Sequence, residues 1–309
     1  MNIDKQLDII VPCFNEEKNL DIFTQKLLET IKKINIKYKI IFVDDGSKDT
    51  TWNKISNLSE NNKNIIGIKL SRNFGHQAAL KAGIDFAQGD YVFSLDADLQ
   101  DPPELLLLMI NKMRNNNLNI VYAQRRKNKE NFLKKFFSYL FYYFFNKICK
   151  INILNQVSDF RLIDKKVLTQ LKLINENNLF YRGLIPWMGF SYDIILFDRP
   201  NRLHGETGWS ISKMVDFALI GIFNFSTLPM KLSFFICLVM IFVFTIFFIY
   251  AFYSYIINDV VRGWTSLALI ISFFNIMIFF ILGLISEYVG RIYYEVKKRP
   301  NYIINETTE

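Results

Sequence analysis

The N-terminal part of the chain alternates short apolar runs with amphipathic stretches. The apolar runs have the length of strands, and apolar residues between them recur with the helical period of about 3.6 residues. Strands that alternate with helices predict βαβ units and a mostly parallel sheet. The predicted strands are residues 7–11, 38–43, 65–70, 91–95 and 120–123, and the predicted helices are residues 16–34, 50–60, 75–86 and 103–114.

Two long uncharged runs dominate the C-terminal third of the chain. They cover residues 232–257 and 264–286 and are bounded by charged residues such as Lys231 and Glu287. A helix needs about 20 apolar residues to cross a bilayer core, and both runs are long enough. Two buried core helices are the alternative, but Phe and Ile occur on every face of both runs. The sequence therefore predicts two transmembrane helices in a hairpin over residues 229–290.

The flanks of this hairpin predict its topology. The link between the runs, residues 258–263, is short, so both flanks lie on one side of the membrane. Residues 291–309 form a basic tail with a Lys-Lys-Arg run. Because cationic residues near span ends favour the cytoplasmic side, we expect residues 1–228 and both termini in the cytoplasm. No apolar stretch of signal-peptide type precedes the first strand.

Two further stretches have the pattern of amphipathic helices. Residues 132–148 place Phe, Leu and Ile on one face, with basic residues on the other face and at the flanks. Residues 211–225 lead into the first long apolar run. Aromatic and basic side chains suit the membrane interface, so we predict that both helices lie there. Packing against the sheet is the alternative for residues 132–148.

The net charge and the numbers of cysteines and histidines bear on which partners and which kinds of site the chain can have. An anionic membrane surface explains the formal net charge of +8 more simply than nucleic acid does. The chain has 3 cysteines, far apart, and only 2 histidines, so we predict neither a disulfide framework nor a zinc site. His76, at the start of the third predicted helix, is expected to brace that helix. The predicted partners therefore include the membrane and no nucleic acid.

Acidic residues follow three of the predicted strands. Asp96 and Asp98 come directly after the fourth strand, Asp44 after the second, and Glu17 shortly after the first. The carboxyl ends of parallel strands meet at one edge of a sheet, where α/β folds bind ligands. Two carboxylates there can hold a divalent cation that shares its other positions with phosphates, which predicts a nucleotide diphosphate. For Asp44 alone, a turn with a helix cap is the alternative.

Several stretches form a set of motifs: VPCFNEE at 11–17, VDDGSKDTT at 43–51, SRNFGHQAAL at 71–80, GDYVFSLDADLQDPPELL at 89–106, SDFRLID at 158–164 and RGLIPWMGF at 182–190. Together they resemble the family-2 glycosyltransferases of GT-A fold, and within these the polyprenyl-phosphate glycosyltransferases such as bactoprenol glucosyltransferases and dolichol-phosphate mannose synthases. The resemblance implies a Rossmann-like GT-A domain over residues 1–228. It also implies inverting transfer of one sugar from a nucleotide-sugar, UDP-glucose or a similar hexose donor, to polyprenyl (undecaprenyl) phosphate.

The resemblance also implies residues that bind the donor. Asp96 and Asp98, with Gln100, would bind the donor diphosphate through Mg²⁺ or Mn²⁺. UDP is expected rather than GDP because of the likeness to the bactoprenol type. The nucleotide-binding candidates are Pro12, Asn15, Glu17, Asp44 and Asp96.

The catalytic candidates by the same resemblance are Asp159, Asp98 and Arg202. A phosphate monoester is largely dianionic at neutral pH, because its second pKa is about 6. Asp159 is therefore expected to orient the acceptor or stabilise an oxocarbenium-like centre, rather than to remove a proton. Candidates for contact with the lipid phosphate are Arg125, Lys135 and Ser138.

Two rival functions make different demands on the sequence. A processive polysaccharide synthase would carry Gln-x-x-Arg-Trp after the acceptor aspartate, and this chain has no such pentapeptide. A membrane-anchored nucleotide-sugar-binding assembly subunit without turnover would be free to lose its carboxylates. Asp44, Asp96, Asp98 and Asp159 are all present, which favours an enzyme. The family resemblance also allows a homo-oligomer such as a tetramer.

Overall fold

The computed structural model describes residues 5–126, 154, 157–176, 179–198 and 263–308, together with parts of 233–253. The chain divides into two compact units. The first unit consists of Met1–Ile220 and Pro300–Glu309, and the second of Gly221–Arg299. The predicted interfacial helices over residues 132–148 and 211–225 lie outside the described residues.

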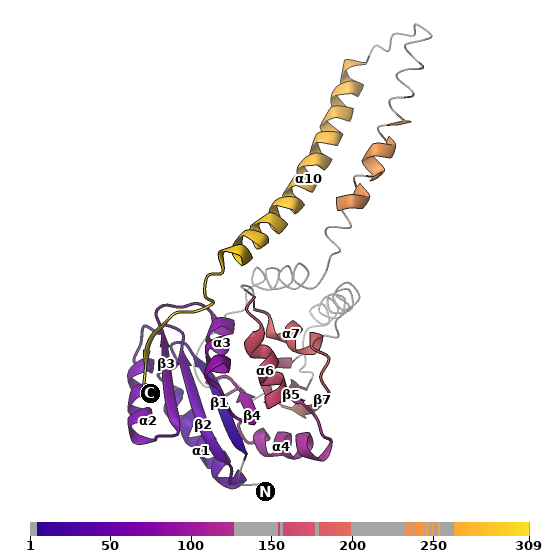
Figure 1. Ribbon diagram of the computed structural model, residues 1–309. Helices are drawn as coiled ribbons and strands as arrows, with labels where there is room; N and C mark the ends of the chain where they lie inside the picture. The colour runs from indigo at the N-terminus through magenta and orange to yellow at the C-terminus, as the bar shows by residue number, and fades with distance from the viewer. Residues whose placement is uncertain are drawn as a thin grey trace. The chain divides into compact units, whose positions relative to one another are not determined.

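One sheet of eight strands forms the described centre of the first unit, in the order β7-β5-β6-β4-β1-β2-β3-β8 (Figure 1). β1 is parallel to β2 and β4, β2 to β3, and β5 to β7. β6 is antiparallel to β4 and β5, and β8 is antiparallel to β3. The mostly parallel sheet predicted from the sequence is therefore confirmed. The strands are β1 (Gln6–Cys13), β2 (Lys37–Asp44), β3 (Ile65–Leu70), β4 (Tyr91–Ser94), β5 (Ile120–Arg125), β6 (Val157–Asp164), β7 (Tyr192–Phe197) and β8 (Ile304–Thr307).

The first four described helices of the first unit correspond to the four predicted from the sequence, whereas the helices over Lys165–Leu173 and Tyr181–Trp187 have no predicted counterpart. α1 begins at Leu20 rather than at residue 16, because a turn precedes it in which Asn19 N donates to Glu16 O (3.0 Å). β6, β7 and β8 have no counterpart among the predicted strands. The helices are α1 (Leu20–Ile34), α2 (Thr51–Asn61), α3 (His76–Phe86), α4 (Leu105–Asn115), α6 (Lys165–Leu173) and α7 (Tyr181–Trp187).

The two faces of the sheet bury different helices. α1 contacts α2 and α4, and Phe23 of α1 belongs to the same core as Ile9 of β1. α3 contacts α6 and lies against β1, where a Cβ added to Gly83 would be 2.3 Å from Cγ2 of Ile10. Because successive strand residues point to opposite faces, α1 and α3 cover opposite sides of β1. Each fully buried large apolar side chain in these layers contributes roughly 1.5–3 kcal/mol.

α10 (Trp264–Lys297) is the long helix of the second unit (Figure 1). Among the described residues, it is the one helix long and apolar enough to cross a membrane, because Phe273–Lys297 contains an 18-residue window with a mean hydropathy of 1.8. It covers the second predicted apolar run. The first run contains a shorter apolar helix, Ser233–Val243, that is only partly described. The two-helix hairpin therefore stays a prediction.

The C-terminal residues contribute to the sheet. The sequence predicts a basic tail over residues 291–309, but α10 continues to Lys297 and β8 then pairs with β3. β8 has the sequence Ile-Asn-Glu-Thr, which lacks the alternation of apolar and polar residues that signals a strand. The edge strand therefore could not be predicted from its own sequence.

Gly46, just after β2, allows two loops to approach closely. Its φ is +68°, and a Cβ there would lie 2.4 Å from the carbonyl carbon of Arg72 and 2.6 Å from the amide nitrogen of Asn73. Gly189 has a similar φ of +72°, but an added Cβ would meet nothing within 4 Å. The two glycines therefore share a backbone conformation and differ in their surroundings.

We predict that Gly46→Ala lowers the free energy of unfolding more than Gly189→Ala does. Both substitutions place a side chain in the left-handed region, at a cost of about 1–2 kcal/mol. Only alanine at 46 also overlaps the backbone of a neighbouring loop. Urea denaturation of the detergent-solubilised variants measures the difference, and equal losses for the two would contradict the close approach.

Candidate active site

A pocket of about 310 Å³ opens at the carboxyl edge of the sheet, where β1, β2 and β4 end. Ligand sites in α/β folds form at this edge because parallel strands deliver their following loops to one place. The lining residues come from the last residues of β1 and from the segments after β1, β2, β3 and β4. They are Pro12, Cys13, Phe14, Glu16, Asp45, Asn73, Gly75, His76, Ala79, Asp96, Ala97 and Asp98.

Three of the predicted nucleotide-binding residues follow or end β1. Pro12 lines the pocket. Asn15 Oδ1 instead accepts a hydrogen bond from Lys48 N (2.9 Å), and Glu17 Oε2 accepts one from Thr50 Oγ1 (2.9 Å). The Asn15 and Glu17 side chains therefore hold the loop after β2 against the loop after β1, beside the pocket rather than in its wall.

Two adjacent aspartates at the end of β2 have different surroundings. Asp45 accepts hydrogen bonds from Phe74 N (2.7 Å) and Gly75 N (2.9 Å), and so shapes the loop that leads into α3. Asp44 Oδ1 accepts from Ser47 N (3.2 Å), but the buried Oδ2 has no hydrogen-bond partner among the described residues. Burial raises the pKa of both carboxyl groups. Asp44 thus keeps a free acceptor for a ligand or water.

The predicted metal ligands lie after β4. Asp96, with 31% of its side chain exposed, and Asp98 both line the pocket. Asp98 Oδ1 accepts from Gln100 N (3.1 Å), and Gln100 is buried outside the pocket wall. Asp101 lies behind them, 3.9 Å from Arg125 Nη2. Burial raises the pKa of Asp101 to about 8, and the negative charge of Asp96 adds to this effect.

The carboxylates of the pocket meet only part of what a divalent cation needs. No group of three or more His, Cys, Asp or Glu side chains in the described chain forms a preformed metal centre. Mg²⁺, however, commonly takes one or two protein carboxylates and fills its other positions with water and substrate phosphates. Burial is the main cause of the raised pKa of Asp101, but the neighbouring negative charge that adds to it is what a cation would relieve. Asp96 and Asp98 therefore fit a divalent cation that binds together with a diphosphate.

Asp159 of β6 is buried, with 4% of its surface exposed. Arg161, two residues further and so on the same face of the strand, forms an ion pair with Oδ1. Gln77 Nε2 donates to Oδ2 (3.0 Å), and Arg182 Nη2 lies 3.9 Å from that oxygen. Burial alone would raise the pKa of Asp159, but Arg161 and the other cationic neighbours hold it well below its usual range. Asp159 is therefore ionised at neutral pH.

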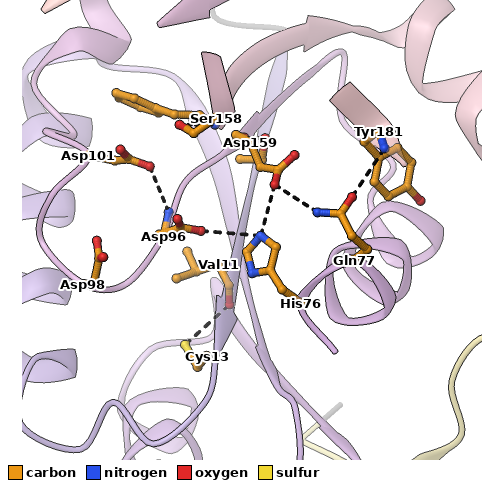
Figure 2. Close-up of polar contacts among 12 residues, drawn as sticks. Val11, Cys13, His76, Gln77, Asp96, Asp98, Asp101, Ser158, Asp159 and Tyr181 are labelled. Atoms are coloured by element: carbon orange, nitrogen blue, oxygen red, sulfur yellow. Dashed lines mark hydrogen bonds and ion pairs between the residues drawn. The ribbon is translucent and has the colours of Figure 1, made fainter. Parts of the chain in front are cut away.

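His76, the first residue of α3, joins the two carboxylate groups (Figure 2). Its Nε2 lies 3.6 Å from Asp96 Oδ1 and 3.3 Å from Asp159 Oδ2. Burial lowers the pKa of His76, but the two carboxylates outweigh it and raise that pKa to about 9. The His76 side chain lines the pocket and is 42% exposed, whereas the Asp159 side chain is only 5% exposed and does not line the pocket.

The sequence predicts only a bracing role for His76, and none for Gln77, Arg161 or Arg182. A usable signal was present, because His76 and Gln77 begin the helix after a parallel strand, and such helices begin at the ligand-binding edge. Arg161 follows Asp159 at the spacing that places both on one face of a strand.

The remaining predicted site residues are only partly described. Arg125 ends β5 and is near Asp101, as given above. Lys135, Ser138 and Arg202 lie outside the described residues. Their predicted contacts with phosphate therefore stay predictions.

Comparison with known proteins places this chain in a family. Residues 8–172 match the family described as Glycosyl transferase family 2. The chain is a family-2 glycosyltransferase. An uncharacterized glycosyltransferase of Synechocystis is 40% identical, over 97% of this chain and 95% of that protein. The bactoprenol glucosyl transferase of Shigella phage SfII is 34% identical, over 98% of each chain.

The enzyme class and the GT-A α/β fold implied by the motifs are thereby confirmed for this transferase. Among solved structures, mannosyl-3-phosphoglycerate synthase from Rubrobacter xylanophilus is similar, with a TM-score of 0.47 and 13% identity. That likeness covers 70% of this chain and 71% of the other.

We predict that Arg161→Met destabilises the transferase by about 3–5 kcal/mol, because it leaves the buried Asp159 carboxylate short of a counter-charge. Arg126→Met is the matched control. Arg126 pairs with Asp198 at 3.2 Å, but the two side chains are 61% and 76% exposed. Loss of an exposed pair costs about 0–1 kcal/mol. Denaturant midpoints compare the variants, and similar values would contradict the importance of the buried pair.

Proposed function

We propose that this transferase moves a single hexose from a UDP-sugar, such as UDP-glucose, to polyprenyl (undecaprenyl) phosphate at the cytoplasmic face of the membrane. The observation that carries the proposal is the pocket, in which His76 connects the Asp96 carboxylate to the Asp159 carboxylate. The alignment with a bactoprenol glucosyl transferase along almost the whole chain supports the choice of acceptor.

The donor would bind with its diphosphate beside Asp96 and Asp98. These two residues, with Gln100 close by, would hold Mg²⁺ or Mn²⁺, and the cation would neutralise negative charge on the leaving diphosphate. The Asp44 carboxylate offers its unpaired Oδ2 to a base imide or a ribose hydroxyl. Pro12 forms the wall nearby.

The acceptor needs little activation. Its phosphate is largely dianionic at neutral pH, so an oxygen attacks the anomeric carbon without giving up a proton. As the new carbon–oxygen bond forms, the bond from that carbon to the diphosphate breaks, and UDP leaves with the bonding electrons. Attack opposite the leaving group inverts the anomeric carbon. The products are polyprenyl-phosphate hexose and UDP.

Asp159 suits an electrostatic role better than that of a base. Its carboxylate already accepts from Arg161 and Gln77 and is ionised at neutral pH. It also fixes His76, whose side chain reaches the pocket. Preorganised charges of this kind stabilise the charge that develops in a transition state. Asp159 would therefore orient the site and stabilise positive charge at the anomeric carbon.

The lipid acceptor requires a membrane-bound enzyme. Apolar side chains of α10 are exposed, including Ile276 at 64% and Phe279 at 71%, which suits contact with lipid. We place α10 as the second helix of the predicted transmembrane hairpin, with the catalytic domain and both termini in the cytoplasm. Arg125, Lys135 and Ser138 are the proposed contacts of the acceptor phosphate, and Arg202 is the proposed catalytic contact to phosphate near the reaction centre.

Transfer is tested with purified full-length protein in vesicles that contain undecaprenyl phosphate and a panel of radiolabelled nucleotide-sugars. We expect a lipid-extractable product with one hexose, formed from a UDP-sugar. Asp96→Asn and Asp98→Asn should each lower kcat by about 10²–10³ or more, because the leaving diphosphate loses its counter-charge. Asp193→Asn is the control. Asp193 lies near the start of β7, away from the carboxyl edge that forms the pocket, so this variant should keep its activity.

The cation is tested separately by a chelator. Activity should be lost in the chelator and return with added Mg²⁺ or Mn²⁺. Full turnover in the chelator, or by Asp96→Asn, would refute the assignment of the cation.

Asp159→Asn should lower kcat about 10²-fold with little change in the KM for the donor, because the lost charge acts in the transition state. Steady-state kinetics with the lipid acceptor measures both constants. A variant that keeps most of kcat would exclude both proposed roles of Asp159.

A further inference from the structure

The C-terminal residues 302–308, which we call the C-terminal clasp, cover the outer edge of β3. Within β8, Thr307 pairs with Ile68 and Ile304 with Leu70. Ser71 N also donates to Ile303 O (2.9 Å). The clasp therefore occupies the sheet edge and begins at the carboxyl end of β3, next to the loop that leads to α3.

The far end of the clasp is also closely fitted. Thr308 Oγ1 accepts from Gly67 N (2.8 Å) and lies 2.7 Å from Ser59 Oγ of α2. A Cβ at Gly67 would lie 2.6 Å from Cγ2 of Ile55 and 3.2 Å from Cγ2 of Thr308. Glycine at 67 thus leaves the space in which α2 and the clasp both pack on β3.

The clasp also binds α3 through a side chain. Tyr302 OH donates to Asp85 Oδ2 (2.9 Å), and the other oxygen of Asp85 accepts from Lys81 Nζ (2.7 Å). Lys81 is only 3% exposed and donates in addition to Lys172 O (3.3 Å) at the end of α6. A buried lysine needs its counter-charge, so the contact from Tyr302 joins a network that fixes α3 against α6.

These contacts bear on the pocket because α3 and the loop before it form part of its wall. The loop contributes Asn73 and Gly75, and α3 contributes His76. Asp45 holds the loop from β2, and Ile303 of the clasp holds its first residue, Ser71. The loop and helix that position His76 are thus held by the clasp at Ser71 and at Asp85.

We propose that the C-terminal clasp is a positioning element of the transferase, with Tyr302 as a positioning residue that acts on the active site through α3. The clasp holds α3 in the position where His76 contacts Asp96 and Asp159 and where Gln77 contacts Asp159. The proposal rests on the proposed function only for its kinetic readout.

The first experiment compares Tyr302→Phe with Tyr192→Phe in the full-length protein. The change removes one hydroxyl in each case, and Tyr192 is a 43% exposed residue of β7. Small displacements of catalytic groups reduce turnover strongly, so Tyr302→Phe should lower kcat about tenfold while the KM for lipid phosphate stays within about twofold. Tyr192→Phe should match the unmodified enzyme.

The second experiment removes Pro300–Glu309 and returns it as a synthetic peptide. An extended peptide can add to an exposed strand edge. We expect kcat to fall about 10²-fold on truncation and to recover with the peptide, but not with a scrambled one. If the truncated protein does not fold, Tyr302→Phe still tests the proposal, because it leaves the backbone ladder intact.

Hydrogen exchange provides a readout that needs no turnover. Amides in residues 71–80 should exchange faster in Tyr302→Phe than in Tyr192→Phe, while those of α4 stay unchanged. Unchanged exchange in residues 71–80 would overturn the proposal, and so would faster exchange with an unaltered kcat, since the clasp would then only cover an edge. If the unmodified enzyme transfers no sugar to lipid, the proposed function fails, and exchange together with UDP affinity then decides for or against the clasp.

Discussion

A single buried carboxylate, that of Asp159, holds together the parts of the chain that make up the active site. A charge removed from water is tolerated only when it is paired and hydrogen-bonded. Arg161 provides the ion pair from β6 itself, Gln77 and His76 reach it from α3, and Arg182 reaches it from α7. Three elements must therefore keep fixed positions for one charge to be stable, and this is the preorganisation that sugar transfer needs.

Acidic residues at the carboxyl edge fall into two classes with different duties. Both carboxylate oxygens of Asp45 accept hydrogen bonds from backbone N–H groups, and Glu17 accepts one from the loop after β2. These residues therefore shape the loops. Asp96 and Asp98 face the pocket, where their negative charges oppose one another. The first class fixes the loops around the pocket, and the second is the basis of our proposal that a cation binds there together with a diphosphate.

Much of the fold follows from local pattern, and the exceptions have physical reasons. The strands β1 to β5 are apolar runs followed by polar loops, so their positions could be predicted. β6 could not, because Asp159 and Arg161 interrupt its apolar pattern, although the two neutralise each other inside the sheet. β8 is polar, and its partner β3 is distant in the sequence, so only the fold reveals the pairing.

The site residues also divide into those that local sequence pattern predicts and those that only the packing of the fold reveals. Asp96, Asp98 and Pro12 follow or end predicted strands, and they line the pocket. The position of His76 between two carboxylates depends on how α3 packs, which local pattern does not describe. Its place at the helix start suggested that it braces the helix, and only the tertiary contact with Asp159 gives it another role.

The order of segments along the chain explains why the last strand lies at an edge. The second unit, Gly221–Arg299, is inserted between two segments of the first. A chain that returns after such an insertion can join a finished sheet most simply at an edge, because an edge strand needs only one partner and displaces none. The entropy of closing the intervening chain grows only slowly with its length, so a short ladder and a few side-chain hydrogen bonds are enough to hold it. Without β8, β3 would present unpaired backbone groups to solvent, an arrangement that invites pairing with other chains. The return of the chain therefore protects the edge of the sheet and, by the same contacts, stiffens the helix that carries His76.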